Sequence, residues 1–276
     1  MITQLLQYFS TLTPAERGLL MSLGFIVFWL FEALLPFRTS VVSSKKHIVN
    51  NLFFAFSTAV VNIFMAVFIL GAVEYADTNQ IGLLYMVVLD PWLKFTLGIL
   101  VLDFFTSYLI HVCLHKSKWL WRIHLVHHSD PHLDSSTAIR LHPFENLIRI
   151  GFLILTIVLF GIDLGSLFLY QTVAVFFSQL GHANLRLPKL LNSMLSVFFV
   201  TPNMHQVHHH YEMPYTDSNY GNIFSVWDRL FGTYKTMNAE NLVYGVDTFP
   251  DAKKNGNLWE LLKQPFHKYR RPTTEN

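Results

Sequence analysis

Long runs of apolar residues, separated by short polar segments, fill the first two thirds of the chain. The first run covers about residues 18–37 and follows Thr13 and Glu16, whose spacing predicts a capping box at the start of a helix. The second run, 50–73, contains no charged residue, and the third, 92–110, begins just after a proline that is typical of a helix start. About 20 apolar residues cross a bilayer as a helix, so each run predicts a membrane span.

A fourth apolar region, 147–180, is too long for one helix and contains Gly161, Asp163 and Gly165 near its middle. It predicts a hairpin of two membrane helices that turns at these residues. A last short run, 190–200, is too brief to cross and is expected to lie on or dip into the membrane surface. The pattern as a whole predicts an all-α, polytopic integral membrane protein with about four to five membrane helices.

The charges in the loops predict the orientation of these helices. The loop after the first run carries Arg38, Lys45 and Lys46, whereas the loop after the second carries Glu74 and Asp77 and no Lys or Arg. Cytoplasmic loops are enriched in Lys and Arg, so the first loop, the polar segments that carry most of the histidines and the C-terminal region are expected on the cytoplasmic side. There they would form a helical cap.

Composition agrees with a membrane protein and excludes several other classes. Hydrophobic residues make up 52% of the 276 residues and charged residues only 14%. The single cysteine, Cys113, excludes an internal disulfide and an iron–sulfur cluster, and a net charge of +2 without a basic run gives no indication of nucleic acid binding. No internal repeat or linker divides the chain, so we expect one domain over residues 1–276.

Twelve of the fourteen histidines lie between positions 111 and 210. Most fall into three clusters at helical spacing, which read His111-x3-His115, His124-x2-His127-His128 and His205-x2-His208-His209. Residues three and four apart share one face of a helix, so each cluster can direct its imidazoles to one point. Eight such donors exceed what one four-coordinate ion uses, and they indicate a site for two metal ions at the membrane.

These clusters, HVCLH, HLVHH and HQVHHH, resemble the three histidine boxes of the fatty acid hydroxylase and sterol desaturase superfamily of membrane-bound di-iron enzymes. The segments STAIRLHPFE, GHANLRLP and DSNYGNIFSVWDRLFGTY are similar to stretches of its sterol-desaturase-like branch. The resemblance covers about residues 103–234, which we expect to form the catalytic core. It is specific for the superfamily and not for the substrate.

The resemblance implies a set of metal ligands. The eight clustered histidines match the box positions and would be catalytic iron ligands. His182 matches a further histidine that members place between the second and third boxes, and His142 matches a less uniform position, as a ligand or a residue beside the ligands. We expect His47, His132, His210 and His267 to be bystanders, with His47 isolated in a basic loop.

Polar residues near the clusters are candidates for supporting the ligands. Asp103 and Ser107 precede His111 by eight and four residues, so a carboxylate there could accept the distal N–H of a histidine. The alternative is that Asp103 pairs with a basic residue such as Arg122 or Arg140. Further candidates are Glu145, Asn184 and Asp228, and an ordinary ion pair or helix cap is an equal alternative for Asp228.

The resemblance implies an oxidoreductase in which two Fe²⁺ ions and O₂ hydroxylate or desaturate an unactivated C–H bond of a lipid such as a sterol or fatty acyl chain. The absence of a dinucleotide motif or a haem signature predicts a separate electron donor, cytochrome b5-like or ferredoxin-like. One alternative is a zinc-dependent membrane hydrolase, although no HExxH sequence occurs. Another is a transporter or metal-storage protein, whose histidines should lie within the spans.

Overall fold

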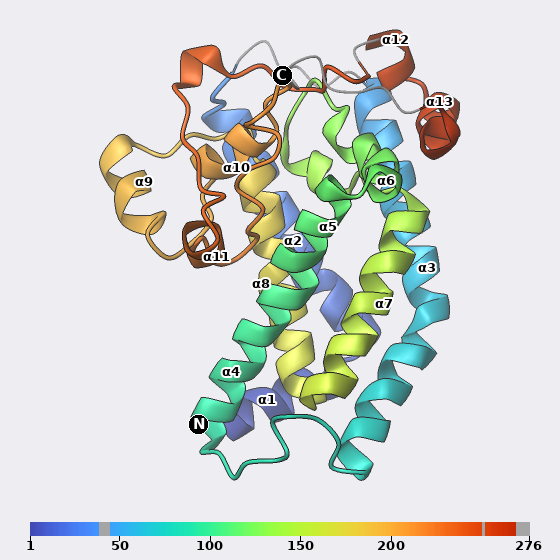
Figure 1. The fold of residues 1–276 in the computed structure, drawn as a ribbon, viewed down its shortest axis with the longest axis vertical. Helices are drawn as coiled ribbons and strands as arrows, with labels where there is room; N and C mark the ends of the chain where they lie inside the picture. Colours follow the sequence, from blue (N-terminus) through green and yellow to red (C-terminus); the bar gives the residue numbers. More distant parts are fainter. Residues whose placement is uncertain (39–44, 250–251, 269–276) are drawn as a thin grey trace.

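The computed structural model describes residues 1–38, 45–249 and 252–268 of the chain. The described residues form a bundle of long helices with a cap of short helices at one end (Figure 1). Five helical segments are long and apolar enough to cross a membrane. They are α2 (Pro14–Leu34), α3 (Lys45–Thr78), the continuous segment Pro91–Lys116, α7 (Pro143–Phe160) and α8 (Leu164–His182). The all-α membrane fold expected from the apolar runs is therefore confirmed.

The third of these segments changes its helical form on the way to the cap. It consists of α4 (Pro91–Asp103), a π-helical turn η1 (Phe104–Leu109) and α5 (Ile110–Lys116). Turns of π-helix inside an α-helix are rare and frequently occur at functional sites. The π turn lies directly below the first histidine cluster.

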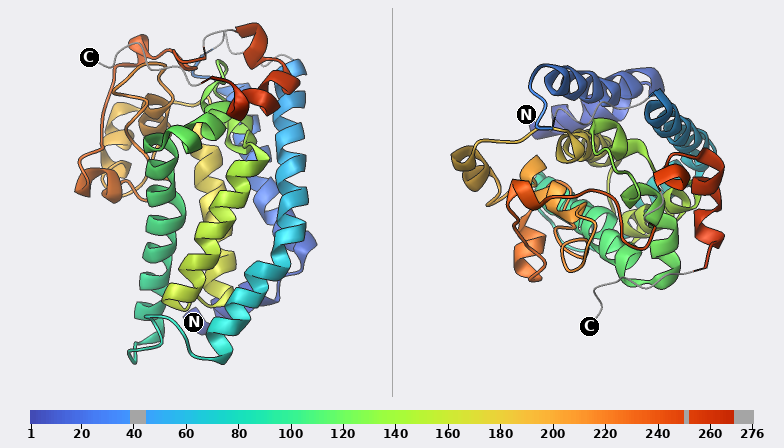
Figure 2. Two further views of the ribbon diagram at one scale, coloured as in Figure 1. Left: turned by 45° about the vertical axis from the view of Figure 1, so that its right-hand side comes forward. Right: turned by 90° about the horizontal axis from the view of Figure 1, so that it is seen from above.

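The cap contains the remaining helices, apart from α1 (Ile2–Thr11), which lies at the opposite end of the bundle (Figure 1). The cap helices are α6 (Lys118–His128), η2 (Ser135–Ile139), α9 (Lys189–Leu195), α10 (Pro202–His208), α11 (Val226–Leu230), η3 (Ala239–Asn241), α12 (Ala252–Asn255), α13 (Leu258–Lys263) and η4 (Gln264–Phe266). The α9 helix stands at the outer edge of the cap in both the side view and the view from above (Figures 1 and 2).

The helix starts follow from local hydrogen bonds that the sequence encodes. The Thr13 hydroxyl accepts from the Glu16 amide, and the Glu16 carboxylate accepts from the Thr13 amide at 2.8 Å, so the expected capping box is present. Asp90 caps α4 by accepting from the Trp92 amide at 2.9 Å. Each cap satisfies backbone N–H groups that have no partner within the helix.

The predicted hairpin is formed by α7 and α8. Gly161 ends α7 with φ of 73°, a left-handed conformation that glycine adopts without steric cost. Asp163 then caps α8, because its carboxylate accepts from the Ser166 amide at 2.9 Å. The turn brings the chain back toward the cap, which places His182 at the same end as the other histidine clusters.

The α3 helix is longer than a bilayer requires. Its 34 residues extend about 51 Å, whereas the hydrocarbon core is about 30 Å thick. The first turns contribute buried polar side chains to the cap: His47 lies 3.2 Å from Asp130 and 3.1 Å from Asp134. The expectation that His47 is isolated is wrong, because the helix begins earlier than the apolar pattern indicates and carries His47 into the cap.

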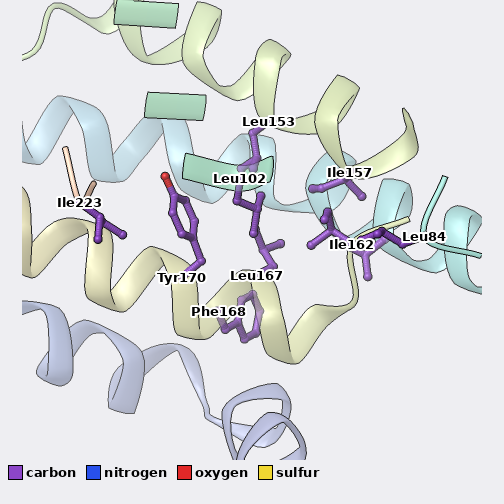
Figure 3. Close-up of a cluster of buried hydrophobic side chains, with 10 residues drawn as sticks. Leu84, Leu102, Leu153, Ile157, Ile162, Leu167, Phe168, Tyr170 and Ile223 are labelled. Carbon is purple, nitrogen blue, oxygen red and sulfur yellow. The ribbon is translucent and has the colours of Figure 1, made fainter. Parts of the chain in front are cut away.

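The apolar core lies between the long helices below the cap. Leu102 of α4, Leu153 and Ile157 of α7, and Leu167 of α8 are buried and turn toward one another (Figure 3). The hydroxyl of Tyr170, at the edge of this core, lies 2.7 Å from the Ser107 hydroxyl. The core therefore fixes α4, α7 and α8, three of the helices that hold the histidines in place.

Candidate metal centre

Four helices bring nine histidines together in the cap, where α5, α6, α10 and the last turn of α8 converge (Figure 1). The first histidine group consists of His111, His115, His124, His128 and His208. The second histidine group consists of His127, His182, His205 and His209. Within each group, one ring nitrogen per residue lies within 4.8 Å of all the others, and every ring is buried. All eight clustered histidines and His182 are thus placed where two metal ions would need them.

The two groups are contiguous. The rings of His128 in the first group and His209 in the second are stacked with centroids 4.5 Å apart. His124 and His127, one from each group, are stacked at 5.1 Å. The alternation follows from helical spacing, because the second box directs His124 and His128 to one group and His127, between them, to the other.

Backbone carbonyls fix the tautomer of several rings. A carbonyl oxygen only accepts, so His111 donates from Nδ1 to the Tyr220 carbonyl at 2.8 Å. His208 donates from Nδ1 to the Ser218 carbonyl at 2.6 Å. A neutral imidazole has only one N–H, which is on Nδ1 in both residues. The Nε2 atom of each ring is therefore unprotonated, and its lone pair faces the first histidine group.

Carboxylates fix the tautomer of two further rings in the first histidine group, because each accepts a hydrogen bond from Nδ1. His124 Nδ1 lies 3.0 Å from Glu145 Oε1, and Glu145 is completely buried. His115 Nδ1 lies 3.2 Å from Asp217 Oδ1, whose other oxygen accepts from Lys116 at 2.6 Å. An outer carboxylate of this kind orients a metal-binding histidine and raises its basicity.

The inward nitrogens have no satisfactory protein partner. The Nε2 atoms of His115 and His208 and both ring nitrogens of His128 and His209 are buried without a hydrogen bond. His111 Nε2 and His124 Nε2 lie 3.1 Å apart, and the tautomers fixed above leave a lone pair on each. Two lone pairs at this distance repel each other unless a cation lies between the rings. The donor set therefore fits bound metal ions.

Burial keeps the rings in the neutral form that binds metals. Burial lowers the pKa of His127, His128 and His209 well below its usual range, and the neighbouring imidazoles lower it further. The same two causes lower the pKa of His205 and His208. Metal ions bind deprotonated imidazole, so protons compete weakly for these sites at neutral pH.

His142 lies outside both histidine groups. Its Nδ1 accepts from the Phe144 amide at 3.2 Å, and its Nε2 lies 3.3 Å from the Leu262 carbonyl. It is the N-cap residue of α7. Both ring nitrogens are thus used in hydrogen bonds, and the structure gives His142 no place among the ligands.

Three of the expected bystanders lie outside both groups as well. His210 Nδ1 accepts from the Val243 amide at 3.1 Å. The His132 ring packs edge-on against His47, and His267 lies 3.9 Å from Glu260. His210 is buried, so its exclusion follows from direction and not from exposure.

Asp103 is buried. Contrary to expectation, its carboxylate hydrogen-bonds neither a histidine nor a basic residue. Its carboxylate accepts from the Trp227 indole at 2.9 Å and from the Phe224 and Ile223 amides at 3.3 and 3.4 Å. The expectation relied on α-helical spacing up to His111, and the π turn between them changes that spacing. Asp103 instead anchors the loop before α11, which also carries the Tyr220 carbonyl.

Asn184 and Asp228 hydrogen-bond the backbone or side chains of neighbouring segments and not the histidine rings. Asp228 accepts from the Tyr220 and Gly221 amides at 2.8 and 2.9 Å, which fixes the loop that bonds His111. Asn184 donates from its backbone amide to Glu32 of α2 at 2.6 Å. Both residues therefore support the loops around the site, whereas Glu145 contacts a ring directly.

Sequence reasoning missed three residues around the site. Asp217 is the first residue of the family-like stretch DSNYGNIFSVWDRLFGTY, and its place in that stretch was the only available signal. Glu32 accepts from Ser135 at 2.8 Å as well as from Asn184, so it joins the first span to the cap. The Trp121 ring packs against His115 and His128 with centroids 4.7 and 5.2 Å apart. The contacts of Asp217 and Glu32 join residues more than a hundred positions apart, which no local pattern marks. Trp121 is close in sequence to both rings, but nothing in its local pattern distinguishes it from an ordinary core tryptophan.

Comparison with known proteins agrees with this geometry. The profile of the fatty acid hydroxylase family matches residues 95–233. An alkylglycerol monooxygenase from Caenorhabditis elegans is 29% identical over 67% of the chain. The ornithine lipid hydroxylase OlsE from Rhizobium tropici is 29% identical over 52%, and the human alkylglycerol monooxygenase is 31% identical over 64%. No solved structure matches the chain.

The matched region contains all nine grouped histidines. Eight of them belong to the three boxes, and His182 lies between the second and third boxes. The chain spans 36% of the nematode relative and 44% of the bacterial one. Five apolar helices and membrane oxygenases among the relatives together identify a multi-pass membrane protein. Because the family profile covers half of the sequence, including every box, the chain belongs to the fatty acid hydroxylase family.

Proposed function

We propose that the chain is a membrane-bound oxygenase that uses two iron ions and O₂ to hydroxylate a C–H bond of a lipid. One oxygen atom enters the C–H bond as a hydroxyl group, and the other leaves as water with two protons and two electrons from a separate donor. Bound iron supplies the redox chemistry with O₂ that an unactivated C–H bond requires. The chain holds the metal ions, keeps water away from them and positions the lipid.

The observation that carries this proposal is the pair of facing lone pairs on His111 and His124, 3.1 Å apart in a buried site. Burying bare imidazole nitrogens without a partner is costly, and metal coordination removes that cost. We assign one ion to the first histidine group and the other to the second. Zinc sites use four protein ligands or fewer, so nine converging imidazoles favour two ions of a metal with higher coordination numbers, such as iron.

Glu145 and Asp217 hold His124 and His115 in the tautomer that directs Nε2 inward. Asp228 acts indirectly, by fixing the loop whose Tyr220 carbonyl orients His111. These contacts make the site rigid before metal binds, which limits the ordering that binding requires.

The relatives favour hydroxylation over desaturation and a lipid over a soluble substrate. Their names describe oxidation of alkylglycerols and hydroxylation of ornithine lipids, and a putative methylsterol monooxygenase from Dictyostelium discoideum is 29% identical over 52% of the chain. A lipid hydrolase that uses zinc has no such support. The histidines also lie at one end of the bundle and not along its length, unlike the path of a transporter.

We further propose that the metal centre faces the cytoplasm and receives electrons from a cytochrome b5-like or ferredoxin-like protein. The basic residue Arg38 lies in the loop at the cap end, and Glu74 and Asp77 lie near the opposite end of α3. This charge distribution supports the orientation.

The test uses the full chain purified in detergent and loaded anaerobically with Fe²⁺. We expect about two irons per chain and, with a reduced ferredoxin, an alkylglycerol or ornithine lipid product that contains one atom from ¹⁸O₂. His208→Ala should abolish the product, whereas His210→Ala is the matched control and should not. Stoichiometric zinc with lipid hydrolysis and no oxygen uptake would refute the proposal.

A further inference from the structure

An apolar pocket lies between the membrane helices α4 and α8. It has a volume of about 190 Å³. Its walls come from α4, from α8 and from the loops that precede α10 and α11, and they are Phe95, Ile99, Leu169, Tyr170, Val173, Phe177, Phe199, Ile223 and Phe224. Tyr170 contributes its ring, because its hydroxyl lies 2.7 Å from the Ser107 hydroxyl. The lining therefore offers carbon surface and no polar partner.

The pocket extends from the cap toward the middle of the bundle. On α8, Phe177 precedes His182 by five residues, about 7.5 Å along the helix. On α4, Ile99 precedes His111 by twelve residues, about 18 Å along the helix axis. Along the helix axes, one end of the pocket thus lies just below the level of the histidines, and the other lies deeper in the membrane region.

The outer rim of the pocket is apolar as well. Phe199 lines the pocket and is 38% exposed, and its ring stacks with Phe177 at 5.7 Å. The nearby α9 helix has no buried residue and exposes Leu190 and Met194. Apolar side chains at the edge of a membrane protein contact lipid, so the occupant of this pocket comes from the bilayer and not from water.

We propose that this pocket binds the alkyl chain of the lipid substrate, with the polar head group toward the histidines and the chain end toward Phe95. The proposal rests on the oxygenase function proposed above and adds the position of attack. A lipid in a bilayer keeps its head group at the interface, which is the level of the cap. The carbons nearest the head group therefore lie closest to the metal ions, and hydroxylation occurs there and not at the terminal methyl group.

Photolabelling tests the binding mode without turnover. The full chain in lipid nanodiscs is irradiated with an alkylglycerol that carries a diazirine either at the end of its chain or beside the glycerol. We expect the terminal diazirine to label Phe95, Ile99 or Leu169 and the glycerol-side diazirine to label Phe177 or Phe199. The reverse order, or labels only outside the pocket, would overturn the proposal whether or not the protein is active.

A bulky residue in the pocket tests its role in catalysis. Val173→Phe should raise KM for a long-chain alkylglycerol about tenfold or more, because one or more methylene groups lose their space. Bound metal should be unchanged. The matched control is Val67→Phe on the exposed face of α3, where the same ring meets lipid and KM should stay at the wild-type value. Equal KM values for both variants would disprove the pocket while leaving the oxygenase function intact. If the wild-type protein does not oxidise the lipid at all, the oxygenase function itself is disproved.

Discussion

Glu145→Gln tests how an outer carboxylate supports the metal centre. Glu145 is completely buried in α7, and its Oε1 atom accepts from His124 Nδ1 at 3.0 Å and from Arg149 at 2.8 Å. Glutamine has nearly the same shape, so the change removes the negative charge with little loss of packing. His124 then loses the partner that raises its basicity and holds its tautomer.

The expected loss of metal affinity is confined to one ion, because His124 belongs to the first histidine group only. Loss of such an outer partner lowers metal affinity about 10–100-fold, or about 1.4–2.7 kcal/mol of binding free energy. The first histidine group contains His124, whereas no residue of the second contacts Glu145. We therefore expect one of the two ions to bind more weakly and the other to bind as in the wild-type protein.

The assay is a competition titration of metal-free protein against a chelator of known affinity, with Co²⁺ as a stable substitute for Fe²⁺. The wild-type protein should give two tight sites, and Glu145→Gln should give one tight and one weakened site. Glu74→Gln is the matched control, because Glu74 is exposed at the other end of the bundle. Two unchanged sites in Glu145→Gln would refute the role of the carboxylate, and two equally weakened sites would refute the division into two groups.

Three further predictions follow from the site and the helix caps. His208→Ala and His209→Ala should each reduce bound metal by about one ion, since they belong to different groups, whereas His210→Ala should leave both ions bound; metal analysis of the three purified variants distinguishes these outcomes. Removal of metal with a chelator should lower Tm, and Fe²⁺ should restore it, because the metal binds only the folded site; an unchanged Tm would contradict the assignment. Asp163→Ala should lower the free energy of unfolding by about 1 kcal/mol through loss of the α8 cap, without changing metal content, whereas Asp163→Asn should retain most of the stability.

Local signals were sufficient for the helices and for most of the grouped histidines. Thr13, Asp90 and Gly161 mark helix ends through hydrogen bonds or backbone conformations that involve only neighbouring residues. The spacing of His124, His127 and His128 likewise fixes their directions as soon as the helix forms. These features depend on short segments, so the sequence predicts them.

The supporting contacts could not be predicted in the same way. Asp217 and His115 are separated by 102 residues, and Glu145 reaches His124 from another helix. Asp103 was expected to contact a histidine, but the π turn above it alters the helical spacing. His142 resembles a ligand by its neighbours in sequence, yet its position at the start of α7 uses both ring nitrogens in hydrogen bonds.

The sequence by itself determined the membrane helices, the family and the identity of eight box histidines, because each depends on residue type and spacing within one segment. Only the tertiary structure decided which histidines share a group, which carboxylates hold them and where an apolar pocket forms between α4 and α8. The physical reason is that these relations are distances between segments far apart in the chain, set by the packing of α4, α7 and α8. That packing determines which imidazole lone pairs face each other. A metal ion bound between them would remove their repulsion.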